Sequence, residues 1–76
     1  MKTEEIEQLI QQGMPEARVS VTGGEGKYTA QVISEQFAGL PPIKRHKLVY
    51  ATVNAQIQSG ELHALSIVAK TPDEAA

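Results

Sequence analysis

The chain has 76 residues, of which 41% are hydrophobic and 21% are charged, a composition typical of one small folded domain rather than of a disordered segment. It contains no cysteine, which excludes disulfides, thiolate catalysis and any metal or iron–sulfur site held by cysteines of its own. The net charge of −2 at pH 7 gives the chain as a whole no attraction for nucleic acids or anionic membranes, so any such binding has to be local.

Residues 3–13 predict an amphipathic helix. Thr3 is a candidate N-cap, acidic residues follow in the first turn, and Ile6, Leu9 and Ile10 recur with helical spacing. No stretch of the chain has the length and apolar character of a transmembrane helix, and this acidic N-terminus lacks the apolar core of a signal peptide. We therefore expect a cytoplasmic protein that does not cross a membrane.

Residues 17–33 predict a β-hairpin. The apolar period changes to two, with Val19 and Val21 on one face, and the second strand is expected at Tyr28–Ile33. Between the strands, GGEG (Gly23–Gly26) matches the G-x-x-G tetrapeptide of RNA-binding KH domains. In those domains the tetrapeptide joins two helices, whereas here it joins two strands and contains an acidic residue, so we interpret it as the hairpin turn.

A short helical turn within Ser34–Gly39 and one long helix are predicted next. Leu40-Pro41-Pro42 forces an extended bend, the second proline suits the first position of the long helix, and Gly60 ends this helix after Ser59. Lys44 and Lys47 are expected to face water. The apolar residues expected on the side that packs on the sheet are Ile43, Val49, Tyr50, Val53 and Ile57.

The last strand is predicted at Glu61–Lys70, where His63 begins a mostly apolar face that continues with Leu65, Ile67 and Ala69. Thr71–Glu74 has the residues of a capping box, which we interpret as a helix start without a helix. The order helix, strand, strand, short helix, long helix, strand predicts an α+β fold, αββααβ, with residues 1–76 as a single domain. Its three strands would form a mixed sheet with helices packed on one face.

Position alone leaves two interpretations of His63 open. A lone histidine at the head of a strand is more often a partly buried, hydrogen-bonded structural residue. Alternatively, neutral imidazole is a ligand for iron or zinc. One histidine cannot hold a metal ion, and the chain has no cysteine, so the other ligands would come largely from a partner or from the second histidine, His46.

The run IKRHKLVY (Ile43–Tyr50) places three cations, Lys44, Arg45 and Lys47, at the start of the long helix, where they oppose the helix dipole. They form either a solvated surface or a patch for an anion, an acidic partner or DNA. The short helix, the turn and the basic helix together resemble a helix-turn-helix. No paired carboxylates, and no serine or threonine beside a base, suggest catalysis, so we expect a protein that is not an enzyme.

Four stretches of the sequence resemble the BolA family, and the wording LVYA and HALS is closest to its IbaG (YrbA) branch. The stretches are F-A-G at Phe37–Gly39, R-H-K-L-V-Y-A at Arg45–Ala51, E-L-H-A-L-S-I at Glu61–Ile67 and T-P-D-E at Thr71–Glu74. The resemblance is specific over residues 37–74. It implies a class II KH-like fold without the KH phosphate loop, in agreement with the order of elements predicted above.

The resemblance also implies an adaptor. BolA-like proteins bind monothiol glutaredoxins of the CGFS kind, and the pair can share a [2Fe–2S] cluster held by the glutaredoxin cysteine, glutathione and a BolA histidine. That histidine matches His63, which makes His63 the leading candidate ligand. The resemblance implies that the protein acts in iron–sulfur assembly or iron homeostasis. The alternative is a DNA-binding transcriptional regulator that uses the basic helix. By itself, the chain is expected to be a monomer or a weak homodimer.

The chain departs from the family in the loop between its first two strands. Many members carry a second histidine or cysteine there, whereas residues 24–28 read GEGKY, so Glu25 or a partner group would take that place, with Lys27 beside it. His46 matches the Arg-His pair of the family and is a second-rank ligand, for which a structural or partner-facing role comes first. Arg45 and Lys47 match a surface that would meet glutaredoxin, glutathione carboxylates or DNA.

Overall fold

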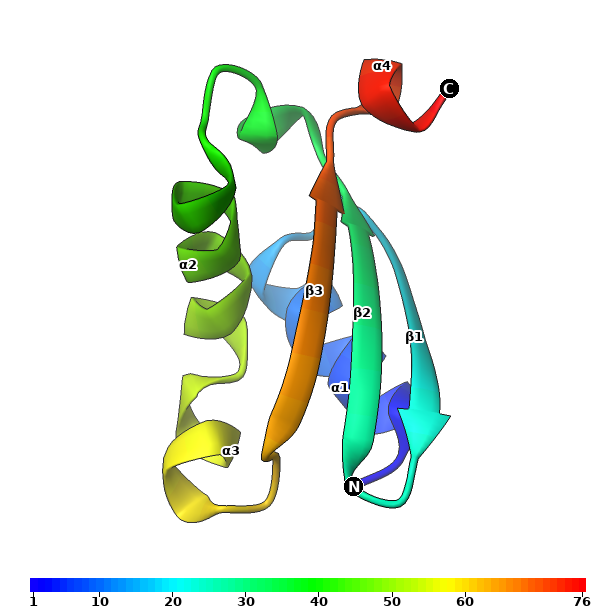
Figure 1. The fold of residues 1–76 in the computed structure, drawn as a ribbon, viewed down its shortest axis with the longest axis vertical. Coiled ribbons are helices and arrows are strands. Elements are labelled where there is room, and N and C mark those ends of the chain that lie inside the picture. The colour runs from blue at the N-terminus through cyan, green and yellow to red at the C-terminus, as the bar shows by residue number, and fades with distance from the viewer.

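Three strands form one mixed sheet with β2 in its centre. In the computed structural model, which describes residues 1–76, β1 (Arg18–Gly24) pairs antiparallel with β2 (Lys27–Ile33), and β2 pairs in parallel with β3 (Ala64–Lys70). Figure 1 shows that the β1–β2 turn, the N-terminus and the start of β3 lie at the same end of this sheet. The two pairings leave β1 and β3 as edge strands.

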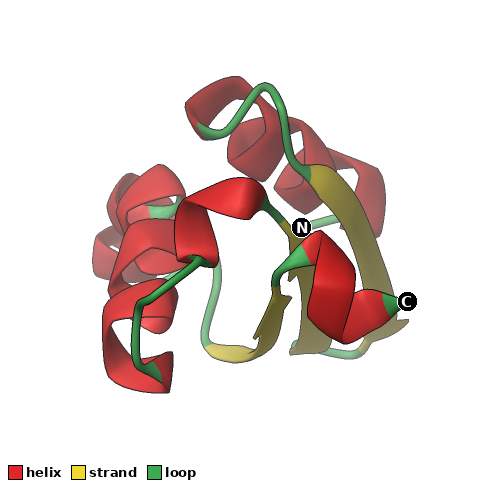
Figure 2. Ribbon diagram, turned by 90° about the horizontal axis from the view of Figure 1, so that it is seen from above, coloured by secondary structure: helices red, strands yellow, loops and turns green.

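The helices gather on one side of the sheet, as Figure 2 shows in a view along the strands. They are α1 (Thr3–Gly13), the 3₁₀ helix η1 (Glu35–Phe37), α2 (Pro42–Thr52) and α3 (Asn54–Ser59), whereas the single turn α4 (Pro72–Ala75) lies beyond the end of β3 (Figure 1). None of them is long and apolar enough to span a bilayer. The predicted α+β fold with a three-stranded mixed sheet is confirmed.

The β1–β2 turn decides where the sheet begins. Glu25 and Gly26 have φ values of 54° and 83°, and positive φ at both central positions is typical of the two-residue type I′ turn, whose twist matches that of a hairpin. The predicted hairpin turn is confirmed. Because these two residues occupy the turn, β2 cannot start before Lys27, and Lys27 pairs with Ala64 as the first residue of β3.

The core lies between the sheet and the helices and consists of 13 buried residues. Its fully buried side chains include Ile6 and Ile10 of α1, Val32 of β2, Phe37 of η1 and Val49 of α2. The alternation predicted for the strands holds, because Tyr28 and Leu65 point into this core while Thr29 and Ser66 are exposed on the other face of the sheet. Helical and strand periodicity together therefore account for most of the interior.

The predicted N-cap of α1 is wrong by one residue. Lys2 precedes the helix, and its backbone N–H donates to Oε1 of Glu5 at 2.7 Å. Thr3 is already helical, and its hydroxyl donates to the neighbouring Glu4 carboxylate at 3.3 Å. Glu5, the third residue of the helix, therefore accepts the backbone N–H of the residue that precedes the helix, which is the role of the glutamate in a capping box.

The long helix predicted from Pro42 to Ser59 is interrupted at Val53, which has φ −122° and ψ 16°. The hydroxyl of Thr52 donates to the Val49 carbonyl at 2.6 Å, and that carbonyl would otherwise accept the N–H of Val53. The Val53 N–H instead donates to the Tyr50 carbonyl at 3.1 Å. α2 and α3 are consequently two helices, with the buried side chain of Val53 at their junction.

The C-terminal capping residues do form a helical turn, contrary to the prediction. The Glu74 N–H donates to Oγ1 of Thr71 at 3.2 Å, and the Thr71 N–H donates to Oε1 of Glu74 at 2.9 Å. This reciprocal pair is a complete capping box. One turn would be marginal by itself, and here it is also held by Arg45 of α2, which pairs with the Glu74 carboxylate.

Candidate functional site

His63 lies in the loop just before β3 and is exposed, so the prediction that it begins the strand is wrong. The parallel pairing with β2 first reaches Ala64, as described above, and the buried residue of this loop is Leu62, which is 1% exposed. The loop hydrogen bonds run among Gln56, Ser59 and Glu61 and leave the imidazole without a partner in the chain. His63 is therefore neither partly buried nor hydrogen-bonded.

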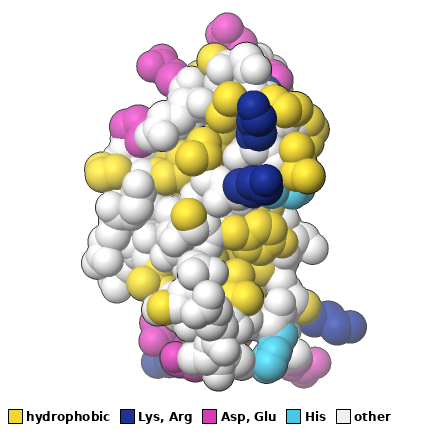
Figure 3. Space-filling model, turned by 90° about the vertical axis from the view of Figure 1, so that its left-hand side faces the viewer, with side chains coloured by type: hydrophobic (Ala, Val, Ile, Leu, Met, Phe, Trp, Pro, Cys, Tyr) yellow, Lys and Arg dark blue, Asp and Glu magenta, His cyan; other side chains and the backbone are white.

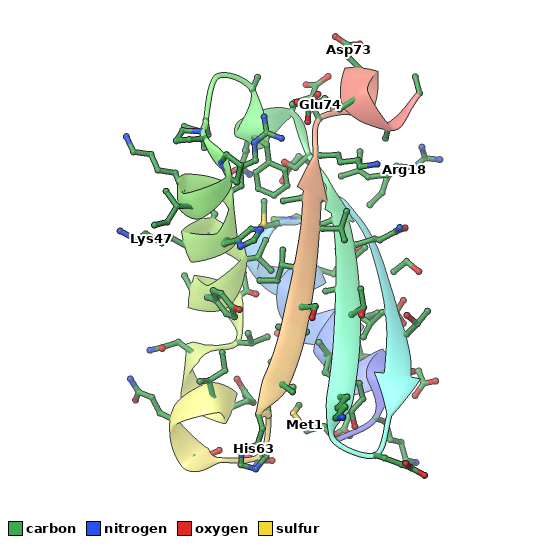
Figure 4. All side chains as sticks on the ribbon, in the orientation of Figure 1. Met1, Arg18, Lys47, His63, Asp73 and Glu74 are labelled. Carbon is green, nitrogen blue, oxygen red and sulfur yellow. The ribbon has the colours of Figure 1, made fainter.

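Gly60 lies beside this imidazole. It ends α3 with a φ of 85°, a left-handed conformation that glycine adopts without strain. A Cβ at this position would lie 3.7 Å from Cε1 of His63, which places the ring beside the glycine backbone. Figure 4 shows His63 at the end of the molecule where β3 begins, near Met1 and away from Lys47 on α2.

The hairpin turn lies at the same end of the sheet as His63. Lys27 pairs with Ala64, so Glu25 and Gly26, which precede Lys27, come to the same end of the sheet as the loop that carries the histidine. Glu25 and Lys27 are both exposed. The register of the two parallel strands thus brings the loop residues singled out in the sequence to the same end of the sheet as the leading candidate ligand.

His46 does not join this end of the molecule. It lies half-buried in the second turn of α2, and Figure 3 shows the two histidines, coloured cyan, as separate groups. No three side chains of the histidine, aspartate or glutamate type come together to hold a metal ion. Any metal or cluster bound through His63 would therefore need ligands from outside this chain.

Arg45 belongs to the fold rather than to an open basic patch. Its side chain is only 13% exposed and donates to the Leu40 carbonyl at 2.7 Å and to the Ala69 carbonyl at 3.1 Å. It also forms an ion pair with Glu74, and its guanidinium lies 6.0 Å from the centre of the Phe37 ring. Arg45 therefore has a structural role that was not predicted, while its place on a partner or nucleic-acid surface stays a prediction.

Lys44 and Lys47 remain as exposed cations of α2. The helix-turn-helix resemblance is not supported by the geometry, because η1, which would be the first helix, has three residues of 3₁₀ structure. The structural role of Arg45 was not predicted from the sequence, although the sequence contains a signal for it. The signal is the capping box at Thr71–Glu74, because a glutamate that accepts the Thr71 N–H can still accept hydrogen bonds from a cation of another element, here Arg45.

Three groups have displaced pKa values, and hydrogen bonds explain the direction of each. The pKa of Glu16 is lowered, chiefly because the Ser34 hydroxyl donates to its carboxylate. The pKa of Glu74 is lowered to about 2, and that of Arg45 is raised, chiefly because the two side chains hydrogen-bond to each other. These groups stabilise the end of the molecule opposite His63. A separate groove of about 230 Å³ lies between α1 and α3, and none of these three groups lines it.

Comparison with known proteins gives one family. Residues 5–74 match the family model described as BolA-like protein. An uncharacterised protein from the rpoN–murA intergenic region of Acinetobacter guillouiae is 38% identical over 74 residues, which cover 97% of this chain and 89% of that protein. The solved structure of a BolA homologue from Coxiella burnetii is also 38% identical, with a TM-score of 0.89, and the match covers 99% of this chain and 96% of that one.

The same fold occurs as one domain of a larger protein. The BolA domain of SufE1 from Arabidopsis thaliana has a TM-score of 0.80 and 32% identity, with 95% of this chain and 93% of that domain covered. In sequence, this chain is 47% identical to SufE-like protein 1 of the same plant over 51 residues, which cover 67% of this chain but only 14% of the plant protein. The family model, the relatives and the fold agree, and the chain belongs to the BolA-like family.

Proposed function

We propose that this protein is a non-enzymatic, cytoplasmic adaptor that binds a monothiol CGFS glutaredoxin and contributes His63 to a [2Fe–2S] cluster shared with that partner and glutathione. The cluster would be cargo that the pair holds and passes on in iron–sulfur assembly or iron homeostasis. Membership of the BolA-like family supports this proposal, and so does the state of the histidine that the resemblance singles out.

The observation that carries the proposal is the exposed imidazole of His63, which has no hydrogen-bond partner in the chain. A structural histidine in a small domain is expected to be partly buried and bonded, because an unpaired polar ring in the interior is costly. A ligand for a partner-held cluster needs the opposite, namely a ring nitrogen that faces outward on a supported backbone. The backbone on either side of His63 is fixed by the helix end at Gly60 and by the pairing of Ala64 with Lys27.

The composition of the chain fits a shared rather than a resident cluster. With no cysteine and no grouping of three histidine or carboxylate ligands, His63 can supply one ligand, and Glu25, in the turn at the same end of the sheet, is the candidate substitute for the missing loop ligand. An imidazole in place of a thiolate removes negative charge from the cluster and raises its reduction potential. Such a ligand is also released by protonation, which suits a cluster that is transferred.

The test is anaerobic reconstitution of the cluster on a CGFS glutaredoxin with glutathione, in the presence of wild type, His63→Ala or His46→Ala protein. Visible absorption and circular dichroism follow the cluster. We expect wild type and His46→Ala to change the spectrum of the glutaredoxin cluster and His63→Ala to leave it as in glutaredoxin alone. His46→Ala is the matched control because it removes the other histidine of the chain, which lies on α2.

Binding to the cluster-free glutaredoxin is measured separately by calorimetry. If His63→Ala changes the cluster spectrum as wild type does, His63 is not a ligand and the proposal is wrong. If none of the three proteins binds the glutaredoxin, with or without cluster, the adaptor function itself is wrong. Binding without any spectral change by wild type would indicate a complex that has no role in holding the cluster.

A further inference from the structure

The large exposed hydrophobic side chains of this protein all lie on α2. Ile43 is 66% exposed, and Leu48 and Tyr50 are each 37% exposed. Ile43 and Tyr50 were both predicted on the side of the helix that packs on the sheet; this is wrong for Ile43, whereas the Tyr50 hydroxyl does reach β3 while its ring stays partly exposed. Isolated exposed hydrophobic residues are ordinary, but three on a single helix of 11 residues form a feature that needs an explanation.

These side chains belong to one surface, here called the α2 face, which consists of Ile43, Lys44, Lys47, Leu48 and Ala51, all exposed. Ile43 and Lys47 are four positions apart, as are Lys44 and Leu48, so each pair is adjacent on the helix surface. Val49 on the opposite side is fully buried. Figure 3 shows this face directly, with hydrophobic surface around two basic side chains.

Tyr50 borders the α2 face on the side of the sheet and is held in place. Its hydroxyl donates to the Leu65 carbonyl of β3 at 3.1 Å, so the ring is half-exposed but fixed. Fixed aromatic side chains of this kind contribute contact area to an interface at little cost in conformational entropy. The α2 face therefore has a rigid edge, and the helix backbone beneath it is anchored by Val49 and Arg45.

The charges of the α2 face have one sign. The sequence from Leu40 to Gly60 contains no aspartate or glutamate, although the whole chain has nine. The ion pair of the chain joins Arg45 to Glu74, which leaves Lys44 and Lys47 without an acidic partner. Uncompensated lysines beside exposed apolar side chains form a surface that a complementary acidic surface would neutralise.

We propose that the α2 face is a docking surface for an acidic amphipathic helix of another protein. Apolar residues of that helix would cover Ile43 and Leu48, and its carboxylates would pair with Lys44 and Lys47. Burial of the apolar side chains would supply most of the affinity, and the charges would set partner choice and orientation. This inference does not depend on the proposed cluster function, because His63 lies at another part of the molecule.

A second copy of the chain fits this surface poorly. A two-fold dimer through α2 would place the face against itself, so Lys44 and Lys47 of both copies would meet with no carboxylate between them. DNA fits poorly as well, because Arg45 is engaged within the fold and Ile43 and Leu48 would lie against phosphates. A partner that carries both carboxylates and apolar side chains would pair with the lysines of the α2 face and also cover its apolar side chains, which neither DNA nor a second copy does.

The experiment is an NMR titration of the ¹⁵N-labelled protein with two synthetic amphipathic peptides, each of about four helical turns. Both carry leucines on one face; one peptide has glutamates on the remaining face and the other has lysines. We expect the acidic peptide to shift the amide signals of residues 43–51 saturably and to bind at least about tenfold more tightly than the basic peptide. Lys44→Glu/Lys47→Glu should reverse this preference, and Ile43→Ser should weaken both peptides.

Lys27→Glu/Lys70→Glu is the matched control, because it makes the same change in net charge with two exposed lysines on the sheet and should leave the preference unchanged. The inference is overturned if the acidic peptide does not saturate, if its shifts lie outside α2, or if the control variant reverses the preference as fully as the α2 variant. It is also overturned if a DNA duplex, or vesicles of phosphatidylcholine and phosphatidylserine, perturb residues 43–51 while the acidic peptide does not. None of these outcomes alters the result of the His63 reconstitution.

Discussion

Arg45 and Glu74 lie 29 positions apart and form a two-point ion pair, with Nη1 to Oε1 at 2.6 Å and Nη2 to Oε2 at 3.2 Å. The same guanidinium donates to backbone carbonyls of the bend before α2 and of β3. Paired donors that match a carboxylate add geometric specificity as well as energy. Arg45 therefore joins the start of α2, the end of β3 and α4, and this contact explains why α4 exists.

Glu74→Gln should unfold α4 while the rest of the molecule stays folded. The substitution removes the charge that pairs with Arg45 and weakens the capping box with Thr71, and one helical turn has little stability without such contacts. Backbone chemical shifts of residues 72–75 should move to disordered values, with the core signals retained. Asp73→Asn, which removes a charge from the same turn without touching the ion pair, is the control and should keep α4. Native shifts in the Glu74 variant would contradict this prediction.

The same carboxylate predicts a dependence on pH. The pKa of Glu74 is lowered from 4.5 to about 2, first by the hydrogen bond from Arg45. A carboxyl group with a lower pKa in the folded state stabilises that state fully above its unfolded pKa, and this contribution is lost as the pH falls through the folded value. The loss should therefore occur between pH 4.5 and about 2. An NMR titration of the Glu74 side-chain carbon with a midpoint near 4.5 would rule out the ion pair in solution.

Ser34→Ala should destabilise the protein by about 1–3 kcal/mol, because a buried hydroxyl with two partners is removed. Ser34 is 2% exposed; it donates to the Glu16 carboxylate and accepts the Gln36 N–H at 3.1 Å. The pKa of Glu16, lowered chiefly by this hydroxyl, should return toward its ordinary value. Urea unfolding and an NMR titration check the two effects, and Ser20→Ala at an exposed position should change neither.

Gly23→Ala and Gly24→Ala should differ although the residues are adjacent. Gly23 has a φ of +123°, and a Cβ there would lie 2.2 Å from the Lys27 carbonyl oxygen, whereas a Cβ at Gly24 meets nothing within 4 Å. We expect Gly23→Ala to lower the free energy of unfolding by about 2 kcal/mol or more, through strain and displacement of the paired strand. Gly24→Ala should be close to neutral. Equal effects in urea unfolding would show that the turn relaxes.

His63→Ala should change the free energy of unfolding by less than about 0.5 kcal/mol, because the side chain is exposed and makes no hydrogen bond within the chain. Leu62→Ala is the neighbouring control; this side chain is 1% exposed, and its truncation should cost about 2–5 kcal/mol. Urea unfolding of both variants separates the two roles. A large loss of stability in His63→Ala would mean that the histidine supports the fold, and loss of cluster binding in that variant would then say nothing about ligation.

Local sequence was enough to predict the elements whose determinants lie within a few residues. The hairpin follows from strand alternation around GGEG, because positive φ is needed at the turn. The inner faces of α1 and of the strands follow from their periodicity. The identity of the candidate ligand followed from the HALS wording, and its placement at the same end of the sheet as the turn is a consequence of strand register that local patterns do not contain.

The sequence by itself therefore determined the order of elements, the α+β class, the absence of cysteine ligands and the histidine to examine. Only the tertiary structure decided that β3 starts after His63, that Arg45 is bound by Glu74, that the long helix breaks at Val53 and that Ile43 faces solvent. The physical reason is the range of the interactions. Turn and periodicity signals act over a few residues, whereas strand register, ion pairs between distant elements and the orientation of a helix depend on contacts that exist only once the chain has folded.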